Sequence, residues 1–182
     1  MRRIGITGGI GSGKSVVSRL LRIMGYSVYD TDSEAKRLME SSLEVVQKLS
    51  ECFGRDIYHN GRLNRGLLSS RVFGKSDKIV LLNSIVHPVV RFDFYRWSES
   101  LNEEICFVES AILYESRFDE LVDEVWTVTA PEELRIGRVR QRSGLTEEEI
   151  KKRMAAQLSE EEKQRRAAHI IWNDGNVSVI HS

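Results

Sequence analysis

The sequence predicts an α/β protein of three layers, with a five-stranded parallel sheet between two layers of helices. Three features of the 182 residues lead to this expectation. Short apolar runs typical of buried strands alternate with segments whose apolar residues recur at helical spacing. A glycine-rich stretch joins the first run to the first helix. A central part, residues 41–102, has helical periodicity and no convincing strand.

The composition is that of an ordinary globular protein. Hydrophobic residues make up 41% of the chain and charged residues 30%, which is typical of such domains. The 27 basic and 27 acidic residues cancel, so no overall field attracts the chain to nucleic acid or a membrane surface. We expect a cytoplasmic single-domain protein with no nucleic-acid, membrane or obligate protein partner. We also expect both cysteines, Cys52 and Cys106, to be buried thiols.

The first strand and helix flank a phosphate-binding loop. Arg3–Thr7 is the apolar run, Gly8–Ser15 reads G-x-x-x-x-G-K-S, and a helical stripe follows and ends at Gly25. The glycines let backbone N–H groups surround phosphates at a helix N-terminus. Lys14 supplies a charge for the β- and γ-phosphates, and the Ser15 hydroxyl can ligate Mg²⁺. The flanking strand and helix argue against a chance match, so we predict ATP and Mg²⁺ as ligands.

A second predicted strand ends in two acids. Ser27–Asp30 is the strand, and the chain continues as Thr31-Asp32 into a helix that we expect from Ser33. Ligands of parallel sheets gather beyond the carboxyl ends of the strands, which places these acids at the ligand crevice. Asp32 is therefore either a helix N-cap or a catalytic group, and one residue can serve as both.

The central segment reads as a helical insertion over the site. We expect one buried stripe at Leu43, Val46, Leu49 and Phe53. Ser76 can begin a further helix, which His87-Pro88 should interrupt because proline disfavours helix in the residue before it. A histidine beside a proline is more often structural than catalytic, and both roles stay open for His87.

Three further strands complete the predicted sheet. Ile105–Glu109 is an apolar run that ends in an acid, where enzymes with this loop hold a carboxylate near Mg²⁺. Val125–Val128 and Ile170–Trp172 are the other two runs, and Asn173 begins a turn on the ligand side.

A charged stretch, residues 135–166, is the predicted lid. Pro131 should occupy the first helical position before it, and Ser143-Gly144 should end that helix. Arg138 and Arg142 lie four residues apart on one helical face. Planar cations in that place can neutralise the charge of a phosphoryl-transfer transition state.

Most other charges of this stretch should face solvent. Thr146–Glu149 and Ser159–Glu162 have the pattern of capping boxes. The residues expected to be solvated are Lys151, Lys152, Lys163 and Arg165.

These motifs favour a small phosphoryl-transfer kinase. A GTPase is disfavoured because the chain has no Asn-Lys-x-Asp tetrapeptide. Two alternatives stay open: a kinase for another small acceptor such as a nucleoside monophosphate, and a non-catalytic nucleotide switch.

The chain resembles the dephospho-coenzyme A kinases over nearly its whole length. The stretches that carry the likeness are Ile6–Ser15, Asp30-Thr31-Asp32, Gly61–Arg65 leading to Val72-Phe73, His87-Pro88, Ile112–Glu115, Ala130-Pro131-Glu132, Arg138, Arg142, Arg153, Gln157 and Asn173. The resemblance implies a P-loop core of residues 1–30, 103–134 and 167–182, a helical acceptor-binding insertion of residues 31–102, and the lid.

The implied reaction moves the γ-phosphate of ATP to the ribose 3′-hydroxyl of dephospho-CoA, the last step of coenzyme A synthesis. Matched by position, Asp32 is the acid that accepts the hydroxyl proton, and Lys14 and Arg142 act with it. Arg65 and His87 fall in the acceptor-binding region, and Ser15 and Glu109 near the metal. The implied ATP-binding residues are Gly8, Gly11, Ser12, Gly13, Lys14, Ser15, Val16, Arg138, Arg142 and Asn173.

Two departures from the family pattern stand out. Glu109 replaces the usual aspartate, and Ala111 replaces a proline two residues later; these departures bear on the metal geometry and on the path of that loop. Val16 stands where a second hydroxyl residue often follows the serine, which should cost little because Ser15 is the expected metal ligand.

Overall fold

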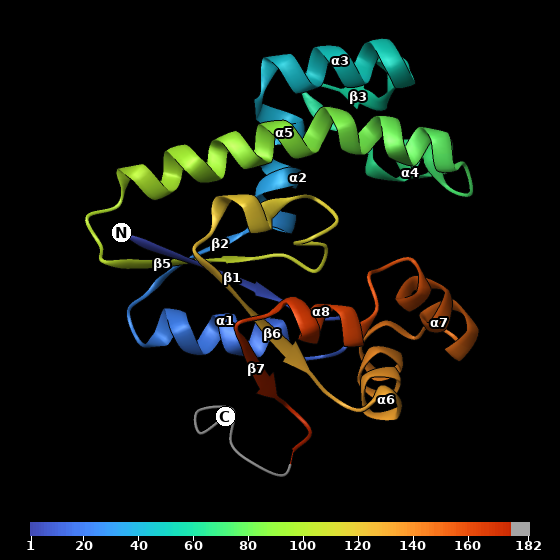
Figure 1. Ribbon diagram of the computed structural model, residues 1–182. Coiled ribbons are helices and arrows are strands. Elements are labelled where there is room, and N and C mark those ends of the chain that lie inside the picture. Colours follow the sequence, from blue (N-terminus) through green and yellow to red (C-terminus); the bar gives the residue numbers. More distant parts are fainter. Residues whose placement is uncertain (176–182) are drawn as a thin grey trace. The chain divides into compact units, whose positions relative to one another are not determined.

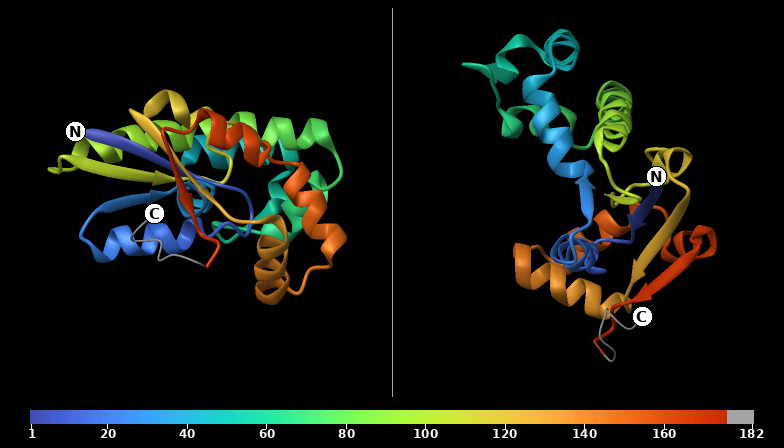
Figure 2. Two further views of the ribbon diagram at one scale, coloured as in Figure 1. Left: turned by 60° about the horizontal axis from the view of Figure 1, so that its bottom comes forward. Right: turned by 90° about the vertical axis from the view of Figure 1, so that its left-hand side faces the viewer.

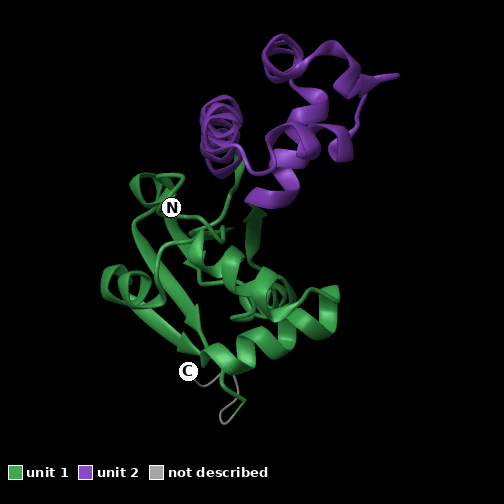
Figure 3. Ribbon diagram, turned by 90° about the vertical axis from the view of Figure 1, so that its right-hand side faces the viewer, with its two compact units in different colours: residues 1–30, 100–182 green, residues 31–99 purple. Residues whose placement is uncertain are grey.

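A computed structural model describes residues 1–175 of the chain, which divides into two compact units (Figure 3). One unit, the core unit, holds residues 1–30 and the chain from Ser100 onward. The other, the helical unit, holds Thr31–Glu99. The predicted last core segment, 167–182, is described as far as Gly175, and its remainder lies outside the described residues.

The core unit is built on a parallel sheet of five strands in the order β2-β5-β1-β6-β7 (Figure 1). All five predicted strands are present, within two residues of the expected ends. The fold class predicted from the sequence, α/β with a five-stranded parallel sheet, is therefore confirmed. The strands are β1 (Arg2–Thr7), β2 (Ser27–Asp30), β5 (Ile105–Glu109), β6 (Glu124–Thr129) and β7 (His169–Trp172).

The register of the sheet brings the ends of three strands together. Glu109 pairs with Ile6 of β1 on one side and with Asp30 of β2 on the other. The phosphate-binding loop begins two residues after Ile6. Two acids and the loop therefore start from the same edge of the sheet, as the rule for parallel sheets predicts.

Helices cover the sheet of the core unit. Helices α1 and α8 lie on opposite faces of it (Figure 2), and one apolar cluster joins α1 to the sheet through Val17, Leu21, Ile4 and Phe107. At the end of α1, Gly25 has φ 93°, and the next N–H bonds back to the Leu21 carbonyl, as in a glycine C-cap. The helices are α1 (Lys14–Ile23), α6 (Glu132–Ser143), α7 (Glu147–Ala155) and α8 (Glu160–Arg166), with a 3₁₀ turn η2 (Phe118–Leu121).

The predicted helix boundaries of this unit hold with one shift. Thr146 and Glu149 form the reciprocal capping box, and the Ser159 hydroxyl accepts from the Glu162 N–H. Pro131 is the N-cap of α6 and not its first helical residue, so the predicted position was wrong by one. Its extended backbone, ψ 142°, explains the shift, because the first helical residue must already have helical dihedrals.

The helical unit contains four helices and a small hairpin among the described residues. The prediction of no strand was wrong, since β3 and β4 pair through Tyr58 with Leu63. Asn60 and Gly61 both have positive φ, as in a tight hairpin turn, and strands of two residues leave no alternation to detect. The elements are α2 (Thr31–Ser41), α3 (Leu43–Phe53), η1 (Arg55–Ile57), β3 (Tyr58–His59), β4 (Arg62–Leu63), α4 (Arg65–Val72) and α5 (Ser76–Ser100).

The predicted break at His87-Pro88 does not occur. Helix α5 runs for 25 residues with Pro88 inside it. Proline removes one helical hydrogen bond, but buried residues on both sides of it, Val86 and Val90 among them, hold the helix in place.

The stripe predicted for α3 is partly right: Leu49 and Phe53 are buried as expected, but Val45 is buried in place of Val46. Leu43, expected in the same stripe, is 86% exposed. Cys52, in the last turn of α3, is exposed, so the expectation of a buried thiol was wrong for Cys52 and right for Cys106. Among residues 1–175, no helix is long and apolar enough to cross a membrane.

Candidate active site

The phosphate-binding loop lies between β1 and α1. Gly13 is the N-cap of α1, with φ 102°, a backbone conformation that residues with a side chain rarely adopt. A Cβ at Gly13 would also overlap the amide of Asn173. The first N–H groups of a helix have no intrahelical acceptor, so the start of α1 at Lys14 offers donors to an anion. The Lys14 ammonium donates to the Gly8 carbonyl at 2.9 Å, folded back on the loop.

Two residues far along the chain close around this loop. The Asn173 side chain donates to the Ser12 carbonyl at 2.9 Å. Arg138 donates to the Asn173 carbonyl at 2.8 Å, and its other nitrogen lies 3.5 Å from the carbonyls of Gly11 and Ser12. The structure thus brings together Lys14, Arg138, Asn173 and the loop, all of which the sequence placed on the ATP side.

Other predicted ATP-side residues remain open to solvent. Ser15 and Val16, in the first turn of α1, are exposed, and so is Arg142 on α6. Arg142 follows Arg138 by one helical turn, so both belong to one face of α6. Most of the remaining charges of α6 to α8 are exposed as expected, but Lys163 is fully buried, so the prediction of a solvated side chain was wrong there.

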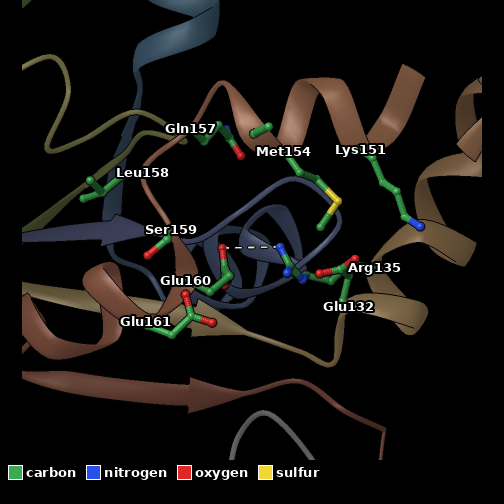
Figure 4. Close-up of a pocket in the computed structure, with 10 residues that line it drawn as sticks. Glu132, Arg135, Lys151, Met154, Gln157, Leu158, Ser159, Glu160 and Glu161 are labelled. Atoms are coloured by element: carbon green, nitrogen blue, oxygen red, sulfur yellow. Dashed lines mark ion pairs between the residues drawn. The ribbon is translucent and has the colours of Figure 1, made fainter. Parts of the chain in front are cut away.

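A buried ion pair beside the loop was missed from the sequence. Arg135, only 5% exposed, lies 3.3 Å from the Glu160 carboxylate (Figure 4). Gln157, quoted above without a role, accepts from the Ile10 N–H at 3.0 Å. These residues line a pocket of about 400 Å³ formed by α6, α7 and α8. Arg135 precedes Arg138 by three residues, and this shared helical face was the signal available in the sequence.

The residues at the sheet edge suit a magnesium ion held mainly by phosphates. Ser15 carries an exposed hydroxyl and Glu109 ends β5 half-buried. No group of three or more His, Cys, Asp or Glu within residues 1–175 could form a cage for a metal. Mg²⁺ in nucleotide sites is bound by one or two protein oxygens together with phosphates and water, so this donor set fits it.

The three residues predicted to act on the acceptor substrate lie on three helices of the helical unit. Asp32 is in the first turn of α2, which begins at Thr31, so the N-cap alternative was wrong. Arg65 begins α4 and pairs with Glu40 at 3.2 Å. His87 is half-buried in α5, where burial and then nearby Arg91 hold its pKa below the ordinary 6.5.

The fold and the phosphate-binding loop define a nucleotide-using phosphoryl-transfer kinase of the P-loop class. The dephospho-CoA kinase family model matches residues 2–178. The dephospho-CoA kinase of Porphyromonas gingivalis is 44% identical over 174 residues, which is 95% of this chain and 86% of that protein. This chain therefore belongs to the dephospho-CoA kinase family.

Solved structures agree with this assignment. A Thermus thermophilus structure superposes with a TM-score of 0.85 at 37% identity, covering 99% of this chain and 92% of that one. The dephospho-CoA kinase from Campylobacter jejuni gives a TM-score of 0.71 at 26% identity, with coverages of 96% and 89%.

Proposed function

We propose that this protein transfers the γ-phosphoryl group of ATP to the ribose 3′-hydroxyl of dephospho-CoA, giving coenzyme A and ADP in the last step of coenzyme A synthesis. The observation that supports this most is the phosphate-binding loop closed by Arg138 and Asn173, in a chain that matches the family model over residues 2–178.

On the ATP side, Lys14 exchanges the Gly8 carbonyl for the β- and γ-phosphates. Arg138 and Asn173 hold the loop backbone, and Arg142 neutralises charge that develops on the transferred group. The remaining members of the proposed ATP site are Gly8, Gly11, Ser12, Gly13, Ser15 and Val16.

Ser15 and Glu109 would hold Mg²⁺. When bound, the ion supplies positive charge beside the phosphate oxygens. Glutamate reaches one methylene farther than aspartate, and its carboxylate would offer Mg²⁺ the same kind of oxygen ligand.

On the acceptor side, Asp32 accepts the proton of the 3′-hydroxyl, and Arg65 and His87 bind the acceptor. A positioned base typically contributes about 10²–10⁴-fold to such a step. Closure of the lid, residues 135–166, would exclude water and so suppress plain hydrolysis of ATP.

The experiment is a turnover assay with ATP and Mg²⁺, run with dephospho-CoA, with AMP and with no acceptor. We expect ADP to form with dephospho-CoA at a rate far above that in the other two reactions. Preference for AMP would contradict the proposed acceptor. ATP binding without turnover in any reaction would contradict catalysis itself.

A further inference from the structure

The turn after β5, residues 110–119, starts beside the phosphate-binding loop. We call it the post-β5 turn. Its first N–H, that of Ser110, donates to the Ile6 carbonyl at 3.0 Å, and the preceding residue is Glu109. Any movement of this turn is therefore transmitted directly to Glu109 and to the end of β1.

Helix α8 holds the post-β5 turn with two basic side chains. The Lys163 ammonium donates to the Ala111 carbonyl at 3.2 Å. One helical turn farther on, the Arg166 guanidinium lies 4.0 Å from the centre of the Tyr114 ring and 2.8 Å from the Asp119 carboxylate. Helix α8 therefore restrains the post-β5 turn at Ala111, Tyr114 and Asp119.

Helix α8 and the connector before it, residues 156–159, also contact the phosphate-binding loop. Gln157 accepts from the Ile10 N–H, and the next residue, Leu158, donates its N–H to Glu115 of the post-β5 turn at 2.7 Å. The Glu160 carboxylate lies so close to the loop that a Cβ on Gly9 would overlap it. Two adjacent residues of the connector thus join the loop to the turn.

Packing of the side chain does not explain why residue 163 is a lysine. Its side chain is fully buried, and burial lowers the pKa of its ammonium, against the attraction of Glu115 and Glu160. Removing a charged amine from water costs free energy that a methionine of similar length would not incur. The charged ammonium is therefore explained by its hydrogen bond to the Ala111 carbonyl.

We propose that Lys163 is a positioning residue for phosphoryl transfer: by holding the Ala111 carbonyl, it fixes the post-β5 turn, and with it Glu109, relative to the phosphate-binding loop. The consequence for catalysis rests on the proposed function, whereas the restraint on the turn does not. Lys163 touches neither ATP nor the acceptor in this scheme, and it acts through Glu109.

The test compares Lys163→Met with Arg165→Met. Arg165 lies on the same helix, is exposed and pairs with Glu162, so its substitution controls for loss of a cation from α8. In the protein without nucleotide, we expect amide exchange across residues 110–116 to be at least about tenfold faster in Lys163→Met, because exchange reports local opening. Exchange in Arg165→Met should equal that of the wild type.

The kinetic readouts follow from the role of Glu109. Loss of a group that orients a metal ligand typically costs about 10–100-fold in activity or metal affinity. We expect Lys163→Met to show a kcat lowered in that range, a several-fold higher Mg²⁺ concentration for half-maximal rate, and little change in KM for ATP. The midpoint of urea unfolding should change little, since relief of a buried charge offsets loss of the donor to the Ala111 carbonyl.

Three outcomes would overturn the proposal: unchanged exchange across 110–116, an unchanged Mg²⁺ dependence, or a kcat loss that merely equals a loss of folded protein. If Lys163→Met does not fold, Glu115→Ala at an exposed position replaces it, and a smaller acceleration of the same exchange is expected. A wild-type protein that does not phosphorylate dephospho-CoA would refute the proposed function, and the exchange experiment would still decide whether Lys163 holds the turn.

Discussion

The two sides of the proposed reaction are encoded in different ways. On the ATP side, the phosphate-binding loop, Arg138 and Asn173 are joined within the core unit by hydrogen bonds to backbone carbonyls. On the acceptor side, Asp32, Arg65 and His87 lie on three separate helices of the helical unit. In the proposed scheme, phosphate binding uses backbone geometry that one short motif specifies, whereas acceptor binding would use side chains that no local pattern brings together.

The largest effect is expected from a substitution on the acceptor side alone. Asp32→Asn should lower kcat by about 10²–10⁴-fold, since an amide cannot accept the 3′-hydroxyl proton. ATP affinity, measured by calorimetry, should stay within about twofold, because the proposed ATP contacts come from the phosphate-binding loop, Arg138 and Asn173. Glu34→Gln, on the same helix, is the control, since Glu34 pairs with Arg37. Wild-type turnover in Asp32→Asn would remove Asp32 from the mechanism.

The next largest effect is expected from a substitution in the phosphate-binding loop, on the ATP side. Gly13→Ala should weaken ATP binding by more than about tenfold, because the new Cβ meets Asn173 at a position with φ 102° and displaces the loop. Gly25→Ala separates the two causes, since Gly25 has φ 93° but open space around it. It should cost about 1–2 kcal/mol of unfolding free energy and leave ATP binding unchanged. Equal ATP affinities in the two variants would contradict the role of Asn173.

A third pair of variants tests the contact between α6 and the loop. Arg138→Met should raise KM for ATP by about tenfold or more, since hydrogen bonds to charged groups contribute about 1.5–3 kcal/mol. Arg140→Met, an exposed neighbour on the same helix, should change KM little. Steady-state kinetics with saturating dephospho-CoA would measure both, and similar KM values would show that the hydrogen bonds of Arg138 are not needed.

A smaller effect should appear in the acceptor KM alone. Arg65→Gln should raise KM for dephospho-CoA by about threefold to tenfold, the range expected when one exposed charged contact worth roughly 1 kcal/mol is lost. KM for ATP should not change. Arg62→Gln, an exposed residue of β4, is the control. A rise in both KM values would argue against separate encoding of the two sides.

The smallest effect concerns pH and the helical unit. Burial lowers the pKa of His87 below 6.5, so below that pH the unfolded chain binds a proton that the folded chain does not. The free energy of unfolding should therefore fall as pH drops through 6.5 toward the folded pKa. His87→Gln should make this fall shallower in urea titrations between pH 7.5 and 5.5. Parallel curves for the two proteins would contradict a buried neutral imidazole.

Local patterns predicted the core unit well. The loop, the strands and the capping box depend on residues close in sequence, so their signals survive without a structure. Lys163 and Arg135 show where this fails. Both lie in a charged stretch that reads as a solvated surface, yet they are 0% and 5% exposed, because their partners come from distant segments and only the folded chain brings these together. Pro88 shows the opposite case, in which tertiary packing overrides a strong local signal.

The central claim is that this protein phosphorylates the ribose 3′-hydroxyl of dephospho-CoA. The most direct test is to determine where the transferred phosphate is attached. Wild-type protein, ATP, Mg²⁺ and dephospho-CoA would be followed by ³¹P NMR, with ADP measured in parallel. The account predicts one new phosphomonoester per ADP, coupled to the ribose 3′ hydrogen of the acceptor. ADP formation without that signal, or a phosphate at another position, would contradict it.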